Sequence, residues 1–450
     1  MKYHFIAIGG SAMHNLAIAL HLKGDHITGS DDEIFNPSKE RLEKYNLLPS
    51  KIGWDPSLID HTIDAVILGM HARADNPELI KAQQLSLSIF SYPEFIYQQT
   101  KNQIRVVIGG SHGKTSITSM ILHVLKDNNV DHNYMVGAQL EGFECMVKLS
   151  ESSKIAVLEG DEYLSSPIDR RPKFHLYYPN IAVISGIAWD HINVFPTFEN
   201  YVKQFQIFAE SVSKDGVIFY CKEDIELNKL MYSPKINCKT TPYLAHEHKV
   251  IDGVTNLVQE NLHIPIEIFG LHNLQNLKAA QLVCKELGVD SHIFYNSISK
   301  FKGASKRLEL VAKNDSSVFY KDFAHSPSKL KATTSALQTQ FPKRKLVACM
   351  ELHTFSSLNK DFLKQYHNSM CMADEAIVYF NEETIKHKKL ELISKDDVKQ
   401  AFGSVNVFTS STEMVSHLKL KNWNHVNLLM MSSGNFNGIN FKELAKEILE

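Results

Sequence analysis

The sequence predicts an α/β protein of three domains. Apolar runs of strand length alternate with helical patterns, and this alternation starts afresh three times along the 450 residues. Strands that alternate with helices form parallel sheets, and a chain of this length ordinarily divides into more than one domain. We place the divisions near residues 100 and 303, which gives domains of residues 1–100, 101–303 and 304–450.

The first domain begins with a predicted strand at residues 3–8, followed by a glycine turn and a helix. The apolar stripe of that helix consists of Met13, Leu16, Ala17 and Leu20. "DHITGSD" and "DAVILGM" are predicted as further strands. Taken alone, the glycine turn with Asp31 about 20 residues further on is typical of a dinucleotide fold. However, Ala7 and Met13–His14 interrupt the G-x-G-x-x-G pattern.

The second domain restarts with the strand "IRVVIG", the loop "GGSHGKT" and a helix. The apolar residues on one face of that helix are Ile117, Met120, Ile121, Val124 and Leu125. "KIAVLEG" and "IAVISGI" follow as strands. A third restart comes after "FKGASKRLEL", with the predicted strands "SVFYKDF", "KLVACMEL", "EAIVYF" and "VNLLMMS".

The stretch "VVIGGSHGKTSITSMILHVL", Val106 to Leu125, combines a strand, a glycine-rich loop and a helix. Such a loop binds phosphate by directing backbone N–H groups and a helix N-terminus at the oxygens. Lys114 is expected to reach the β- and γ-phosphates, and Thr115 to place a hydroxyl on Mg²⁺. The alternative is a glycine-rich turn with a surface lysine, which the strand, loop and helix together disfavour.

Acidic residues follow the strand "KIAVLEG". Glu159 stands at its carboxyl end, where ligands of a parallel sheet collect, and Asp161 and Glu162 complete the cluster "EGDEY". Mg²⁺ prefers such oxygen ligands, although a solvated acidic turn explains the cluster equally well. The next strand leads into "WDHINVF", where Asp190 and His191 could supply a second metal ligand or a base.

Composition excludes several classes of protein. The net charge is -2 with no long basic or acidic block, which argues against a nucleic-acid or anionic-membrane partner. The apolar runs are too short to span a membrane, and the start "MKYHFIAIGG" reaches glycine too early for a signal peptide. Six cysteines without a C-x-x-C pair favour a reducing cytoplasm over a zinc site or a disulfide scaffold. The sequence indicates no oligomeric state.

In chain order, the motifs GKT, E-x-D-E, D-H, H-N-x-x-N, R-L-E and D-F-A-H-x-P resemble those of the Mur ligase family of ATP-dependent, amide-forming enzymes. The family's phosphate loop is the shortened form G-[ST]-[HN]-G-K-T, which "GSHGKT" at Gly110–Thr115 fits. The resemblance covers essentially the whole chain. It implies a Rossmann-like N-terminal domain for a UDP-sugar and a central P-loop ATPase-like domain. It also implies a Rossmann-like C-terminal domain that binds the incoming amine and closes on ATP.

The resemblance also implies roles for individual residues. The implied ATP site consists of Gly110, Ser111, His112, Gly113, Lys114, Thr115, Ser116, His272, Asn273, Asn276, Arg307 and Asp322. The implied metal ligands are Thr115, Glu159 and His191. The implied catalytic residues are Lys114, His191, Arg307 and His325. Arg307 would reach the γ-phosphate, Asp322 the ribose, and His325 the incoming amine. Lys203, in "YVKQF", falls near the position where several relatives carry a carbamylated lysine.

In the first domain, the resemblance implies a UDP-sugar site in place of a dinucleotide site. The glycine turn would meet the diphosphate, and "GMHARADNPE", Gly69–Glu78, matches a second family element. The implied UDP-sugar residues are Gly9, Gly10, Ser11, Ser30, Gly69 and His71.

Two relatives in the family start from UDP-N-acetylmuramate, and they differ in the amine. One adds L-alanine, and the other adds the murein tripeptide L-Ala-γ-D-Glu-meso-diaminopimelate. "DRRPKFHLYYP", Asp169–Pro179, lengthens the segment between Glu159 and the D-H pair, as it does in the tripeptide-adding branch. The tail "MSSGNFNGI" also resembles that branch. Alanine-adding relatives carry two arginines in an H-R-Y-T-R stretch, where this chain has "HTFSS", His353–Ser357. A guanidinium clamp for a carboxylate is therefore missing, and we expect the tripeptide.

The implied reaction is formation of an acyl phosphate from the lactyl carboxylate and ATP, followed by attack of the amine. His191 and His325 are both candidates for the base. The chain departs from the family's motifs at two places. "GIA" at Gly186–Ala188 replaces the family's N-x-E, and Ser326 replaces a histidine. A P-loop kinase and a non-catalytic nucleotide-binding relative are the alternatives. The intact Lys114, Thr115, Glu159 and Asp322 argue against the second.

Overall fold

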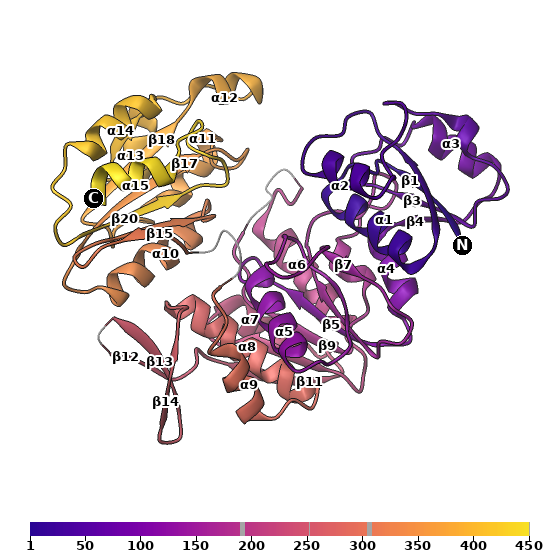
Figure 1. Ribbon diagram of the computed structural model, residues 1–450, viewed down its shortest axis with the longest axis horizontal. Helices are drawn as coiled ribbons and strands as arrows, with labels where there is room; N and C mark the ends of the chain where they lie inside the picture. Colours follow the sequence, from indigo (N-terminus) through magenta and orange to yellow (C-terminus); the bar gives the residue numbers. More distant parts are fainter. Residues whose placement is uncertain (190–193, 252, 304–307, 450) are drawn as a thin grey trace. The chain divides into compact units, whose positions relative to one another are not determined.

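The computed structural model describes residues 1–189, 194–251, 253–303 and 308–449. The chain forms two compact units: the described residues up to Leu244 with Lys278–Ser297, and Ala245–Leu277 with the described residues from Ile298 onward. Each predicted domain contains one parallel-rich sheet with helices beside it (Figure 1). The α/β, three-domain fold is thereby confirmed, while the divisions at residues 100 and 303 stay a prediction.

The N-terminal sheet is parallel, in the order β2-β1-β3-β4. Its strands are β1 (Lys2–Ile6), β2 (His26–Ser30), β3 (Ala65–Leu68) and β4 (Ile89–Ser91). Its helices are α1 (Ser11–Lys23), α2 (Ser38–Lys44), α3 (Pro77–Gln84) and α4 (Tyr92–Thr100), with a short 3-10 turn η1 (Pro56–Leu58). Every residue of β3 is buried, because helices cover both faces of a parallel sheet.

The central sheet has the order β11-β10-β9-β5-β8-β6-β7 and is parallel except for β7. Its strands are β5 (Ile104–Gly109), β6 (Asn133–Met135), β7 (Val147–Lys148), β8 (Ile155–Glu159), β9 (Ile181–Ile184), β10 (Val217–Cys221) and β11 (Lys239–Tyr243). Its helices are α5 (Lys114–Asp127), the 3-10 helix η2 (Lys173–Leu176), α6 (Phe198–Glu210) and α7 (Ile225–Met231). β5 lies between β8 and β9, so the loop after β5 opens at the middle of the sheet.

A small antiparallel sheet follows, which the sequence did not predict. It consists of β12 (His248–Ile251), β13 (Val254–Gln259) and β14 (Leu262–Ile266). Two helices come next, α8 (Leu271–Glu286) and α9 (Ser291–Ile298).

The C-terminal sheet has the order β15-β16-β20-β17-β18-β19 and is parallel except for β15. Its strands are β15 (Glu309–Lys313), β16 (Val318–Asp322), β17 (Lys345–Leu352), β18 (Glu375–Phe380), β19 (Asn406–Phe408) and β20 (Val426–Met431). Its helices are α10 (Pro327–Gln340), α11 (Lys360–Leu363), η3 (Lys364–Tyr366), α12 (Glu382–His387), α13 (Lys395–Phe402), α14 (Ser411–Lys419) and α15 (Phe441–Leu449).

Each face of the C-terminal sheet has its own apolar core. Along β20, Leu428 and Met430 join one core, whereas Leu429 and Met431 join the other. This alternation is the period of two that a strand imposes on its side chains. Within the described part of the chain, no helix combines the length and apolarity needed to cross a lipid bilayer.

Candidate active site at the strand ends

The loop between β5 and α5 requires glycine at two positions. Gly113 has a φ of 75° immediately before α5, in the left-handed region that favours glycine. Gly110 has a φ of 132°, and a Cβ there would lie 2.1 Å from Ser185 Oγ. The glycines thus let the chain turn tightly into α5, whose N-terminus is a favourable place for phosphate oxygens.

Lys114, the first residue of α5, forms a buried ion pair. Its Nζ donates to Glu162 Oε2 at 2.5 Å, and Glu162 is 1% exposed. Burial by itself lowers the pKa of Lys114, but the charges of Glu162 and Asp161 outweigh it and raise the pKa above its usual value. The loop therefore presents a charged ammonium, as its expected role at a triphosphate requires.

Thr115 and Glu159 provide two neighbouring oxygens. Thr115 Oγ1 donates to Glu159 Oε1 at 2.9 Å, and the Gly137 N–H donates to Glu159 Oε2 at 2.9 Å. Burial raises the pKa of Glu159, against the opposing effects of the Gly137 hydrogen bond and of Lys114. A buried carboxylate that a hydroxyl touches is a suitable start for a hard divalent cation. The described residues contain no group of three or more His, Cys, Asp and Glu arranged for a metal, and the third expected ligand, His191, lies outside them.

Ser111 faces inward from the same loop. Its Oγ accepts the Ala188 N–H at 2.9 Å and lies 2.9 Å from Tyr201 Oη, which donates to Glu162 Oε1 at 3.0 Å. Ser185 Oγ donates to the carbonyl of His112. Side chains from the residue after β9, from α6 and from the segment after β8 therefore hold the phosphate loop in place. Sequence reasoning missed Tyr201, which lies 90 residues from its partner Ser111.

The other residues expected at this site either take no part in the phosphate-loop contacts described above or lie outside the described residues. Lys203 is on the exposed side of α6, where its Nζ donates to Gln206 at 3.1 Å, so its position gives no support to a carbamylated lysine. Ser116 is buried in α5. Asp190, His191 and Arg307 lie outside the described residues.

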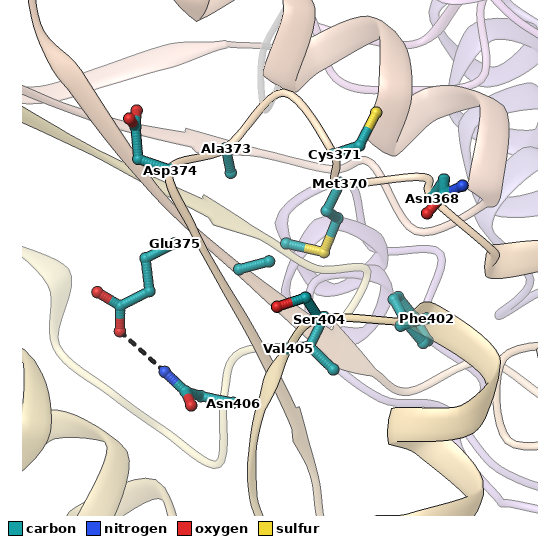
Figure 2. A pocket seen from close by; sticks show the side chains of 11 residues that line it. Asn368, Met370, Cys371, Ala373, Asp374, Glu375, Phe402, Ser404, Val405 and Asn406 are labelled. Carbon is teal, nitrogen blue, oxygen red and sulfur yellow. Dashed lines mark hydrogen bonds between the residues drawn. The ribbon is translucent and has the colours of Figure 1, made fainter.

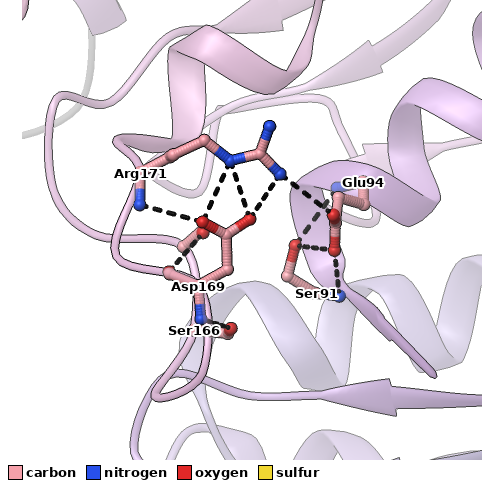
Figure 3. A network of polar contacts seen from close by, with 6 residues as sticks. Ser91, Glu94, Ser166, Asp169 and Arg171 are labelled. Carbon is pink, nitrogen blue, oxygen red and sulfur yellow. Dashed lines mark hydrogen bonds and ion pairs between the residues drawn. The ribbon is translucent and has the colours of Figure 1, made fainter.

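The segment from Asp161 to Tyr177 is held by three further ion pairs. Lys173 Nζ donates to Asp161 at 2.6 Å. Arg171 binds Asp169 at 2.6 Å and Glu94 of α4 at 3.4 Å, as Figure 3 shows. The bonds from Arg171 hold the pKa of Asp169 below its usual value. This segment thereby connects the end of β8 to helix α4.

The N-terminal sheet gathers the expected UDP-sugar residues at its carboxyl ends. The Gly9 N–H donates to Asp31 Oδ2 at 2.7 Å, and Ser30 ends β2. Burial raises the pKa of Asp31 to about 6. A Cβ on Gly69 would lie 3.0 Å from the Ile6 carbonyl. The remaining expected residues there are Gly10, which precedes α1, Ser11, which starts it, and His71, which is exposed.

The expected adenine, ribose and amine residues belong to the second compact unit. Asn273 Nδ2 donates to the Phe269 carbonyl at 2.9 Å, and Asn276, like Asn273, is largely buried in α8, which also carries His272. Asp322, at the end of β16, accepts the N–H groups of Leu308 at 2.6 Å and Ala324 at 2.7 Å. The carbonyl of His325 accepts Tyr366 Oη at 2.6 Å.

Glu351 is a buried carboxylate near the end of β17 that sequence reasoning overlooked. It is 4% exposed and accepts the Phe436 N–H at 2.8 Å and the Ser432 hydroxyl. His353 Nδ1 lies 3.7 Å from its other oxygen. A cavity of about 160 Å³ lies at the same edge, lined by Lys321, Asp322, Phe323, Met430, Ser432, Ser433, Gly434, Asn435, Phe436 and Phe441. The rule that selected Glu159, a carboxylate at a strand end, would also have selected Glu351.

A cavity of about 460 Å³ lies at the opposite edge of the same sheet, at the amino ends of β18 and β19 (Figure 2). Its Glu375 accepts from Asn406 at 3.1 Å and His417 at 2.8 Å and pairs with Lys421. None of the expected site residues lines it, and ligands of parallel sheets bind at the carboxyl ends.

Comparisons with known proteins identify the family of this chain. The family model described as "Mur ligase middle domain" matches residues 108–284, and the one described as "Mur ligase family, catalytic domain" matches residues 2–103. The UDP-N-acetylmuramate–L-alanine ligase of Caldicellulosiruptor bescii is 33% identical over 84% of this chain and 83% of its own. The chain belongs to the Mur ligase family. Members of this family are ATP-dependent amide ligases, and this Mur ligase is therefore an enzyme that forms a C–N bond at the expense of ATP.

Solved structures share the fold of this Mur ligase. A murein peptide ligase from Psychrobacter arcticus has a TM-score of 0.64 at 22% identity, over 99% of this chain and 98% of its own. The UDP-N-acetylmuramate–alanine ligase of Thermotoga maritima has a TM-score of 0.67 at 18% identity, over 97% of this chain and 96% of its own. At these identities the likeness concerns the fold, and the amine substrate has to be argued from the chain itself.

Proposed function

We propose that this Mur ligase joins UDP-N-acetylmuramate to the tripeptide L-Ala-γ-D-Glu-meso-diaminopimelate. The supporting observation is the distribution of arginine. Residues 308–450 contain a single arginine, Arg344, which lies just before β17 and donates to the Asp315 carbonyl at 3.1 Å. The carboxylate of L-alanine is two bonds from its amine and calls for a guanidinium beside the reacting carbon. In the tripeptide that carboxylate is a neutral amide, which suits a strand edge without arginine.

The segment Asp169–Pro179 gives independent support. Its length resembles that of the tripeptide-adding branch, and Arg171 and Lys173 tie it to Glu94 and to Asp161. An ordered segment of this kind can line a binding site, whereas an untethered insertion would first have to be ordered, at a cost in entropy.

In the proposed mechanism, the lactyl carboxylate of UDP-N-acetylmuramate attacks the γ-phosphate in line and gives an acyl phosphate and ADP. Both reactants are anions, so Lys114 would neutralise charge on the transferring group. Thr115 and Glu159 would hold Mg²⁺, which when bound supplies further neutralisation there. The tripeptide amine would then attack the acyl carbon and displace phosphate. His325 is a candidate to accept the proton, and the expected roles of His191 and Arg307 remain proposals.

The remaining ligand roles are proposals of the same kind. Gly9, Gly10 and Ser30 would border the UDP diphosphate, and Asn273 and Asp322 would contact the nucleoside of ATP. We propose a cytoplasmic enzyme, because the cysteine usage and the nucleotide substrates both favour that compartment.

Addition of L-alanine is the second candidate, and one observation favours it. Sequence relatives of 31–33% identity from Caldicellulosiruptor bescii, Caldicellulosiruptor saccharolyticus and Sulfurihydrogenibium are UDP-N-acetylmuramate–L-alanine ligases. ADP release separates the candidates. With UDP-N-acetylmuramate and ATP present, we expect the tripeptide to stimulate ADP formation much more than L-alanine does. Stimulation by L-alanine alone would reverse the assignment, and ADP release without any amine would indicate a kinase-like reaction.

A further inference from the structure

The phosphate-loop lysine, Lys114, is paired with a buried carboxylate. Its ammonium touches Glu162 Oε2 at 2.5 Å, and both side chains are largely buried, 15% and 1% exposed. A triphosphate that takes Lys114 as its partner must therefore come close to the Glu162 carboxylate. Two negative groups at short range in a poorly solvated site repel each other strongly.

Glu162 is held where it stands. Tyr201 Oη donates to its second oxygen at 3.0 Å, which leaves the Tyr201 oxygen to accept from Ser111 Oγ, 2.9 Å away. Ser111 Oγ in turn accepts the Ala188 N–H at 2.9 Å. Because this series of hydrogen bonds ends on backbone, moving the carboxylate away would break more than one bond.

The neighbouring carboxylate is differently placed. Asp161 pairs with Lys173 at 2.6 Å, and its side chain is 34% exposed. The two adjacent acids thus have different cations, and Glu162 is the one that contacts the phosphate-loop lysine. This difference supplies a matched control.

We propose that Glu162 is a positioning residue that makes nucleotide binding depend on a divalent cation. It holds Lys114 in place and opposes the approach of an uncomplexed polyphosphate. When the cation accompanies the nucleotide, its charge offsets the repulsion, and Lys114 can contact both Glu162 and a phosphate oxygen. The inference rests on the proposed phosphate role of Lys114. It accounts for a buried acid beside a site for a polyanion.

The test is the affinity of the full-length protein for ADP, measured by titration calorimetry in excess Mg²⁺ and in excess EDTA. The parent should bind ADP far more weakly in EDTA. Glu162→Gln should bind ADP about tenfold or more tightly than the parent in EDTA, since it removes a charge next to the phosphates. In Mg²⁺ the gain should be much smaller. Glu162→Asp keeps the charge but withdraws it by one methylene, so its gain in ADP affinity in EDTA should be smaller. This variant replaces Glu162→Gln in the test if the glutamine variant does not fold.

The matched control is Asp161→Asn, which removes one negative charge from the same segment but leaves Lys114 paired. Its ADP affinities should follow those of the parent. Equal gains for Asp161→Asn and Glu162→Gln would overturn the inference in favour of a general charge effect. Unchanged binding by both Glu162 variants would overturn it as well. Failure of the parent to bind ADP in either condition would instead refute the phosphate-loop assignment itself, and with it this inference.

Discussion

The carboxyl ends of the central and C-terminal sheets both carry buried acids, but the groups that meet them differ. In the central sheet, Glu159 meets a hydroxyl and a backbone N–H, and a lysine ion pair at Glu162 follows three residues later. In the C-terminal sheet, Glu351 meets the Ser432 hydroxyl and the Phe436 N–H, with His353 at 3.7 Å. Neither lysine nor arginine contacts Glu351 among the described residues.

Under the proposed function, this difference corresponds to two different roles, phosphoryl transfer at the central edge and amine binding at the C-terminal edge. Phosphoryl transfer between two anions needs fixed positive charge, and the central edge provides Lys114 together with oxygens for a cation. In the proposed function, the C-terminal edge would instead meet the tripeptide. Glu351 orders the 432–436 loop by accepting its hydroxyl and N–H groups.

The largest expected effect is at Lys114. We expect Lys114→Ala to reduce ligation on the order of 100- to 1000-fold, because it removes a charge used chiefly on the transferring phosphate. Removing one partner of a buried ion pair also destabilises the fold, by about 3–5 kcal/mol. Lys114→Met with Glu162→Gln removes both charges and should restore thermal stability without restoring turnover. Near-normal turnover of either protein would contradict the phosphate-loop role.

Glu159 should affect the metal requirement. Glu159→Gln keeps the shape of the side chain and removes the charge that a hard cation needs. The Mg²⁺ concentration for half-maximal rate should rise at least about tenfold, the scale of loss typical around metal sites, and the maximal rate should fall. Asp161→Asn is the comparison variant. If the Mg²⁺ dependence of the Glu159→Gln rate coincides with that of the parent, Asp161 or Glu162 is the metal ligand in place of Glu159.

Glu351 should affect the amine substrate alone. Glu351→Gln weakens hydrogen bonds to a charged acceptor, each worth about 1.5 kcal/mol, so the KM for the tripeptide should rise about tenfold. The KM for ATP should not move. Glu375→Gln, on the opposite edge of the same sheet, is the matched control and should leave the tripeptide KM unchanged. An equal rise for both variants would mean that Glu351 acts through general stability.

The smallest expected effect is at Arg171, whose side chain is 52% exposed. Ion pairs of this exposure contribute about 0–1 kcal/mol. Arg171→Ala should therefore change the free energy of unfolding, measured by urea denaturation, by less than about 1 kcal/mol. A larger loss would show that the segment from Asp161 to Tyr177 depends on its contact with α4.

The same comparison shows how far sequence reasoning reaches. Strands such as β9 were predictable because they are short, fully buried apolar runs, whereas β11 and β19 were not, since most of their residues are exposed or half-buried. The antiparallel sheet was not, since strands such as β12 are mostly exposed and lack such a run. Lys114, Thr115 and Glu159 were predictable because the loop motif and the strand end fix their neighbourhood. The Ser111–Tyr201–Glu162 contacts were not, because they join three segments that only the folded chain brings together.

The amine substrate is the central claim, and competition tests it most directly. Equal concentrations of L-alanine and the tripeptide are offered together with UDP-N-acetylmuramate and ATP, and the products are weighed by mass spectrometry. The account predicts that the tripeptide product dominates, because Arg344 is the single arginine of residues 308–450 and lies at the amino end of β17, away from the strand ends where a single amino acid's carboxylate would need a guanidinium. A dominant mono-alanyl product would contradict it and assign the enzyme to L-alanine addition.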